Sequence, residues 1–134
     1  MIPPHSTRTH VILLLISDQL VRTVFQEVLE HEGYFVVTSG NLGSAVDRLK
    51  EHSVDLLITR TYVSDITGHD AAKYLRTKQP GLQVLIVGGF LEDDRLRYRE
   101  SLDGFEVFPK PYTQAQLLDK VREVLASAKQ LESG

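Results

Sequence analysis

The sequence predicts an α/β protein with one parallel sheet that is covered by helices on both faces. Five short apolar runs alternate with five longer segments whose apolar residues recur at helical spacing, and the links between them are short. Strands that alternate with helices pair in parallel through right-handed crossovers. The length of 134 residues and the 42% of hydrophobic residues indicate one globular domain.

Each expected strand is a run of apolar, often β-branched residues, which suits a strand buried on both faces. In chain order these runs are Val11–Ile16, Tyr34–Thr38, Val54–Thr59, Leu82–Val87 and Phe105–Phe108. The first run is too short for a signal-peptide core or a membrane span, so it is also expected to be a strand.

Each expected helix has an apolar stripe. In chain order the helices are expected at 19–32, from 42 to about 49, at 67–78, at 91–102 and from 114 onward. The fourth is the least regular, because its few apolar positions alternate with arginines. The last helix is expected to fray after Ala126, where the sequence becomes polar.

Several helix ends carry start or stop signals. Ser17 or Asp18 is expected to cap the first helix, and Gly33 to end it. Two further starts have the spacing of a capping box. These are Thr67 with Asp70 and Thr113 with Gln116.

The composition narrows the class of protein. Residues 1–9 are expected to be a flexible leader, 10–127 the domain, and 128–134 a polar tail or the start of a linker. The net charge of −3 has no dense run of either sign, so we expect neither nucleic acid nor a membrane as a partner. Cysteine is absent, which excludes disulfides and thiolate metal sites and fits the cytoplasm.

The strand at Val54–Thr59 presents the next residue, Arg60, at its carboxyl end. In open parallel sheets, ligands bind and chemistry occurs at the carboxyl ends of the strands. Arg60 is therefore the central candidate for a functional residue.

Three further features have the spacing of a known family. Lys110-Pro111-Tyr112 follows the last strand, Gly68 lies eight residues after Arg60, and Arg22 lies in the first helix. In these motifs residues 10–127 resemble the receiver domain of two-component response regulators. The resemblance implies a flavodoxin-like, three-layer fold with strand order 2-1-3-4-5 and a role in phosphorelay signal transduction.

The resemblance also assigns site positions, most of them altered in this chain. Arg60 takes the place of the phosphoacceptor aspartate, and Ile16 and Ser17 take the places of two acidic residues that bind Mg²⁺. Asp18 comes one residue late. The remaining equivalent positions are Gly88 for a Ser or Thr, Val107 for an aromatic residue, Lys110 for the family lysine, and Pro111 after a cis peptide bond.

These substitutions predict a loss of phosphoryl chemistry. A guanidinium is a permanent cation and not a nucleophile, so Arg60 cannot accept a phosphoryl group. Mg²⁺ prefers several oxygen ligands, which Ile16 and Ser17 do not supply. We therefore expect no metal, no cofactor and no enzymatic activity.

Arg60 has three candidate roles. An ion pair with Asp18 is the first, and an anion held between Arg60 and Lys110 is the second. In the third, Arg60 extends from the strand end to water. The five histidines, including His69, have no metal-ligand spacing and are expected at the surface.

The expected function is that of a protein-interaction module in signalling, with a histidine kinase or an effector as partner. A homodimer through the fourth helix, fifth strand and fifth helix is a further expectation. Candidate residues for this face are Arg95, Arg97, Arg99 and Tyr112. Two alternatives stay open: phosphorylation at another acceptor, such as Asp18 or Asp65, and a flavodoxin-like domain that binds an anion or nucleotide at the strand ends.

Overall fold

Five parallel strands form the central sheet in the computed structural model, which describes residues 9–88, 105–108 and 113–133. Their order is β2-β1-β3-β6-β7, which confirms the predicted order 2-1-3-4-5. The strands are β1 (Val11–Leu15), β2 (Phe35–Ser39), β3 (Leu56–Arg60), β6 (Gln83–Val87) and β7 (Glu106–Phe108).

Four helices lie close to their predicted positions. They are α2 (Gln19–His31), α3 (Leu42–Glu51), α4 (Gly68–Lys78) and α6 (Gln114–Ser133). The last helix continues past Ala126, where the sequence predicts fraying. The helix expected at 91–102 lies outside the described residues. None of the helices within the described part of the chain is long and apolar enough to cross a lipid bilayer.

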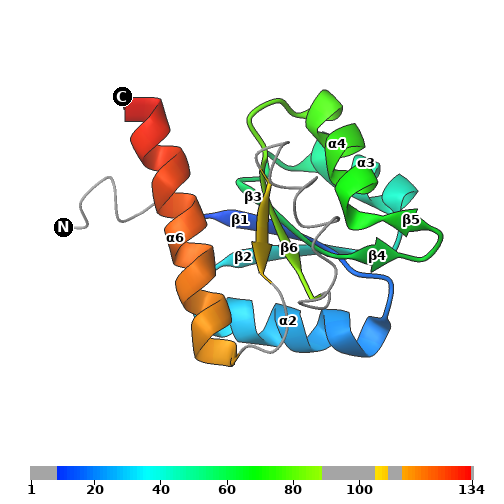
Figure 1. The fold of residues 1–134 in the computed structure, drawn as a ribbon, viewed down its shortest axis with the longest axis horizontal. Helices are drawn as coiled ribbons and strands as arrows, with labels where there is room; N and C mark the ends of the chain where they lie inside the picture. The colour runs from blue at the N-terminus through cyan, green and yellow to red at the C-terminus, as the bar shows by residue number, and fades with distance from the viewer. Residues whose placement is uncertain (1–8, 89–104, 109–112, 134) are drawn as a thin grey trace.

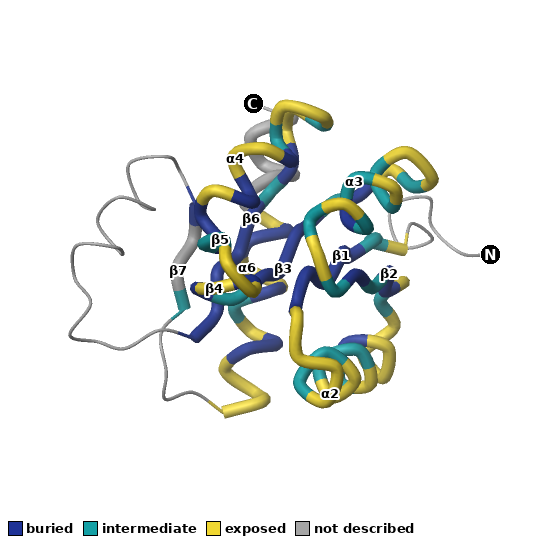
Figure 2. Tube along the Cα trace, turned by 90° about the vertical axis from the view of Figure 1, so that its right-hand side faces the viewer, coloured by how far each residue is buried: buried dark blue, intermediate teal, exposed yellow. Residues whose placement is uncertain are grey.

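The helices form two layers on opposite faces of the sheet (Figure 1). Successive side chains of a strand point to opposite faces, so each strand serves two cores. Leu14 and Ile58 pack with residues of α2 and α6, whereas Leu13 and Leu57 pack with residues of α3 and α4. The strands between these layers are mostly buried (Figure 2). This explains why they are continuous apolar runs in the sequence.

A small hairpin that the sequence did not predict follows β3. Its strands are β4 (Tyr62–Val63) and β5 (Ile66–Thr67), which pair antiparallel. Ser64 in the turn has a φ of 57°, a left-handed conformation that is uncommon for residues other than glycine. Strands of two residues are too short to show a periodicity, and no Asn-Gly or Asp-Gly pair marks the turn.

The predicted helix caps are only partly confirmed. Thr113 and Gln116 form a complete capping box, because each side chain accepts a hydrogen bond from the backbone N–H of the other, at 3.1 and 2.8 Å. Thr67 caps α4 by accepting from the N–H of Asp70 at 3.0 Å. In the described residues the Asp70 carboxylate does not return this bond; it lies 3.8 Å from His69 instead.

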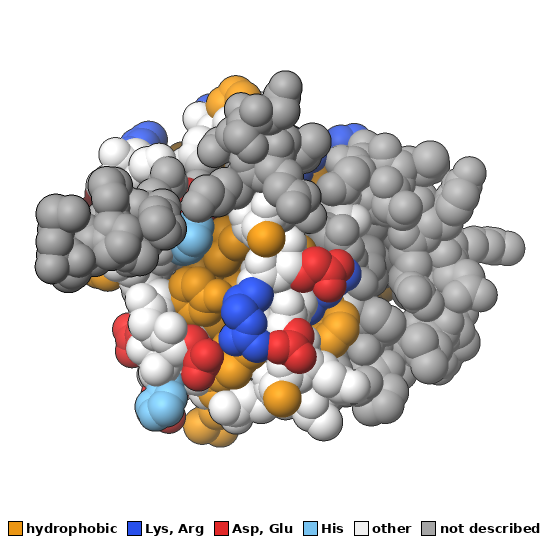
Figure 3. Space-filling model, turned by 90° about the vertical axis from the view of Figure 1, so that its left-hand side faces the viewer, with side chains coloured by type: hydrophobic (Ala, Val, Ile, Leu, Met, Phe, Trp, Pro, Cys, Tyr) orange, Lys and Arg blue, Asp and Glu red, His pale blue; other side chains and the backbone are white. Residues whose placement is uncertain are grey.

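An ion-pair cluster joins α6 to the end of α2. Arg122 lies 3.5 Å from Glu32, the C-cap of α2, and also pairs with Asp119 on its own helix. Figure 3 shows this side of the molecule, with basic side chains flanked by acidic ones. Burial raises the pKa of nearby Tyr34; Arg122 opposes this effect and Glu32 adds to it.

Candidate functional site

The candidate site lies where β1 and β3 end side by side. Leu15 and Thr59 are paired in register, and the Thr59 hydroxyl donates to the Leu15 carbonyl at 2.8 Å. Thr59 is fully buried. This bond holds the two strand ends together, so Ile16 and Arg60 emerge next to each other.

Arg60 is the last residue of β3 and not the first residue after it. It pairs in register with Val87 of β6, which extends the strand one residue beyond the predicted end. Its side chain is half-buried and forms no hydrogen bond or ion pair with any of the residues that the structure describes. Arg60 thus places a cation at the carboxyl end of β3, the central strand of the sheet.

Asp18 caps α2, and the expected ion pair with Arg60 is absent from the described structure. The Asp18 carboxylate accepts a hydrogen bond from the backbone N–H of Val21 at 3.1 Å and is exposed. The first N–H groups of a helix have no partner within the helix, and an aspartate at this position satisfies one of them. The prediction of an Arg60–Asp18 pair was therefore wrong, and the helix-cap alternative is confirmed.

Arg22 contributes a second cation to the site. Its guanidinium donates to the carbonyl of Ile16 at 2.6 Å and lies 3.5 Å from that of Ser17. Gly40 makes room for it, because a Cβ there would lie 3.0 Å from the Arg22 Nη1 atom. In the sequence Arg22 served only as a landmark of the resemblance, and this contact was not predicted. An arginine six residues after the predicted strand end at Ile16 was the signal that could have indicated it.

Gly68 packs directly on the backbone of Arg60. A Cβ on Gly68 would overlap the Arg60 carbonyl oxygen and would lie 3.1 Å from the Thr59 methyl group. The N–H of Gly68 donates to the carbonyl of Thr61 at 2.8 Å. The eight-residue spacing between Arg60 and Gly68 therefore corresponds to a close backbone contact that only glycine allows.

The neighbouring strand ends are described in part. Gly88 has a φ of +86°, and its N–H donates to the carbonyl of Phe108 at 3.0 Å. Val107 pairs in register with Ile86. Six other predicted site residues lie outside the described residues, so their roles, including an anion between Arg60 and Lys110, stay predictions. They are Lys110, Pro111, Tyr112, Arg95, Arg97 and Arg99.

His69 is buried, contrary to the predicted surface position. Only 2% of its surface is exposed, and its ring packs edge-on against Phe105 with 5.4 Å between the ring centroids. The close contact of Gly68 with Arg60 draws the start of α4 onto the sheet, which turns the next residue inward. Helix-start position alone did not predict this.

The donor groups near the strand ends are few. Ser17 and Asp18 are exposed, Ile16 is apolar, and the Ile16 carbonyl is already bonded to Arg22. In the described ranges, no three His, Cys, Asp or Glu side chains lie close enough together to hold a metal ion.

Comparison with known proteins decides the family. Residues 12–122 match the family model of the response regulator receiver domain. The chain belongs to this family. It is therefore a receiver domain of the two-component signalling type.

The curated relatives include short and long proteins. The response regulator receiver protein CpdR of Brucella abortus is 28% identical over 121 residues, covering 87% of this chain and 98% of CpdR. The transcriptional regulatory protein CpxR of Escherichia coli is 29% identical over 114 residues, or 85% of this chain, but only 48% of CpxR is covered. This receiver domain thus spans nearly all of one relative and about half of the other.

Solved structures agree on the fold. A response regulator receiver domain from Clostridium thermocellum has a TM-score of 0.80 at 21% identity, with 91% of this chain and 98% of that one covered. The chemotaxis protein CheY4 of Vibrio cholerae has a TM-score of 0.78 at 18% identity, with 87% and 99% covered. At these identities the likeness shows the fold alone, and it confirms the predicted flavodoxin-like architecture.

Proposed function

We propose that this receiver domain is not phosphorylated at the usual position and acts by binding other signalling proteins. The observation that carries the proposal is Arg60, which ends β3 at the position equivalent to the phosphoacceptor. Aspartyl phosphorylation needs a carboxylate nucleophile, and a guanidinium has no nucleophilic lone pair at neutral pH. The role we propose is therefore that of a binding module and not of an enzyme.

The same site is poorly suited to Mg²⁺, which we propose is not a cofactor of this domain. Asp18 is committed to capping α2, and Arg22 bonds the Ile16 carbonyl. At ~5 Å and an effective dielectric of ~20, two positive unit charges repel each other by about 3 kcal/mol, and a divalent cation is repelled roughly twice as strongly. Two arginines at the strand ends thus oppose a metal that has few oxygen ligands to hold it.

Signalling proteins are the partners that this family suggests. The sensor kinase CckA of Brucella abortus is 26% identical to this chain over 116 residues, which amount to 12% of the kinase. The sensory/regulatory protein RpfC of Xanthomonas campestris is 26% identical over 133 residues, or 18% of its length. We infer that a histidine kinase or an effector in the cytoplasm is the partner class.

Incubation with acetyl phosphate followed by intact-mass measurement tests the proposal. We expect no phosphoryl mass on this chain, while a receiver that has aspartate at the equivalent position gains one under the same conditions. A mass gain would refute the proposal. Its loss in Asp18→Asn or Asp65→Asn would then identify the atypical acceptor, since both carboxylates are exposed.

Anion binding is the second candidate function, and the state of the Arg60 side chain favours it. This half-buried cation has no ion-pair partner among the described residues. A phosphate or a nucleotide phosphate at the strand ends would supply the opposite charge. A thermal-shift screen of phosphate and nucleotides tests this idea: a rise in Tm that is absent in Arg60→Met supports it, and no rise refutes it.

A further inference from the structure

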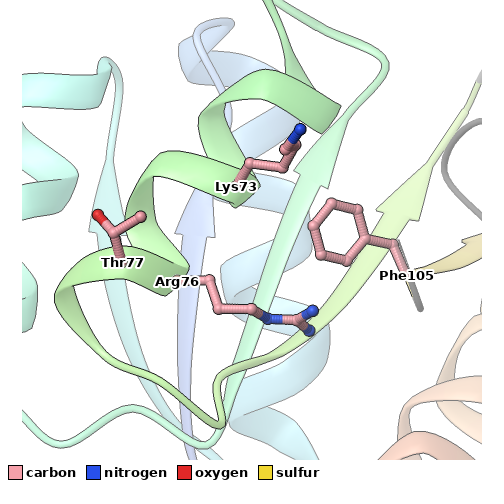
Figure 4. Close-up of a pocket in the computed structure, with 4 residues that line it drawn as sticks. All are labelled: Lys73, Arg76, Thr77 and Phe105. Carbon is pink, nitrogen blue, oxygen red and sulfur yellow. The ribbon is translucent and has the colours of Figure 1, made fainter. Parts of the chain in front are cut away.

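A pocket lies between α4 and the residue that precedes β7. Its volume is about 240 Å³, and its described lining residues are Lys73, Arg76, Thr77 and Phe105 (Figure 4). Phe105 comes just before β7, so the pocket lies toward the amino ends of the strands, whereas Arg60 lies at the carboxyl end of β3. The pocket is thus distinct from the candidate site.

Arg76 forms the cationic wall of this pocket and is held in place by its neighbours. Its Nε and Nη2 atoms donate to the carbonyl of Leu82 at 3.2 and 2.8 Å. Its guanidinium carbon lies 4.7 Å from the centroid of the Phe105 ring. Phe105 in turn packs against His69 on α4. A flat cation over an aromatic ring therefore forms a preorganised surface with one charged and one apolar part.

The exposed side of α4 adds further positive charge. Lys73 and Lys78 are both exposed, and neither forms an ion pair with a residue that the structure describes. Lys78 lies 5.2 Å from the ring of Tyr74, which is itself 45% exposed. The chain as a whole carries a net charge of −3, so this basic side stands out against an acidic background.

We propose that the pocket binds an acidic peptide segment of a partner protein. A carboxylate of the segment pairs with Lys73 beside the Arg76 guanidinium, and a neighbouring apolar side chain packs against Phe105. The volume is below the ~300–1,000 Å³ of typical small-molecule sites, so it suits a side chain better than a cofactor. Among the described lining residues Lys73 is the exposed cation, which suits a single carboxylate better than the repeated phosphates of a nucleic acid.

This inference rests on the proposed interaction role and names one surface and one class of partner for it. The probe is a blocked hexapeptide of alternating glutamate and leucine, titrated into the ¹⁵N-labelled chain. We expect saturable amide shifts confined to the second half of α4 and to Phe105. Because the contact is partly ionic and exposed, we expect the affinity to fall with added salt.

Two variants test the surface. Lys73→Glu should weaken peptide binding by about fivefold, since it replaces an attraction by a repulsion at an exposed site. Lys50→Glu makes the same charge reversal on the exposed side of α3 and should leave binding unchanged. Thr77→Trp, at another exposed lining position, should block the pocket without altering its charge. The amide spectra of all three variants report whether they remain folded.

Besides an absence of peptide binding, four results would overturn the inference. They are equal binding of a lysine–leucine hexapeptide, shifts on another face, an equal loss in Lys50→Glu, and binding of a single-stranded oligonucleotide in place of the peptide. The acetyl phosphate experiment is independent of the pocket. A failure of peptide binding with an unchanged mass would reject this surface and leave the proposed loss of phosphorylation standing.

Discussion

The α-carbon of Gly68 lies against the carbonyl oxygen of Arg60, with no room for a side chain between them. The first residue of α4 is thereby packed on the last residue of β3. The hydrogen bond from Gly68 to Thr61, at 2.8 Å, closes the intervening hairpin. The path of the chain over the candidate site is thus set by backbone contacts.

Gly68→Ala should lower the free energy of unfolding by about 2 kcal/mol, because the added methyl group overlaps the Arg60 carbonyl and forces the backbone to move. Gly43→Ala is the matched control. Gly43 lies in α3, where a Cβ meets only the Asn41 side chain at 3.5 Å, so alanine should stabilise by about 0.5–1 kcal/mol. Urea unfolding followed by circular dichroism measures both. Equal changes would contradict the packing described.

Asp18→Ala should cost about 1 kcal/mol, because the N–H of Val21 loses its acceptor. Asp18→Asn should stay within about 0.5 kcal/mol of the parent, since asparagine caps helices as well as aspartate does. The two variants separate a cap from a charge effect. If the negative charge acted on Arg60, asparagine would lose as much stability as alanine in thermal unfolding.

Titration with Mg²⁺ should leave the amide resonances of Ser17, Asp18 and Arg60 in place. The reason is electrostatic, because Arg22 and Arg60 put positive charge where the metal would bind. Amide NMR at constant ionic strength, with NaCl as the control salt, is the measurement. A saturable shift at these residues with Mg²⁺ alone would show that the site does hold the ion.

Tyr34→Phe should change stability little at pH 7 and should protect the protein at high pH. Burial raises the pKa of Tyr34 above its ordinary value of 10.0. Above about pH 10 the tyrosine of the unfolded chain loses its proton first, which favours unfolding. The stability linked to this shift is complete below that pH and is lost as the pH rises through the folded pKa. Tm measured from pH 8 to 11 should fall more steeply for the parent than for the variant.

The sequence predicted the sheet well because each strand is buried on both faces. A doubly buried strand such as β3 needs a continuous apolar run, and such runs are visible without a structure. The eight-residue spacing from Arg60 to Gly68 was noted in the sequence only as a landmark of the resemblance, and the close contact behind it was not predicted. A close backbone contact of this kind requires glycine at one position, here Gly68.

The unpredicted features depend on tertiary contacts. The sequence allowed two roles for Asp18, an ion pair with Arg60 or a helix cap. Only the position of the Val21 N–H decides between these roles. His69 is buried because α4 is drawn onto the sheet, which no local pattern reports. The contact of Arg22 with Ile16 is the exception, because it is local and spans only six residues.

The contact between Gly68 and Arg60 also couples the end of β3 to α4. Gly68 leaves no gap at Arg60, so any movement of that carbonyl must displace the first turn of α4. The same helix carries Lys73 and Arg76 further along its length. A ligand that shifts the carboxyl end of β3 would therefore also move α4, whose second half carries the pocket residues Lys73 and Arg76.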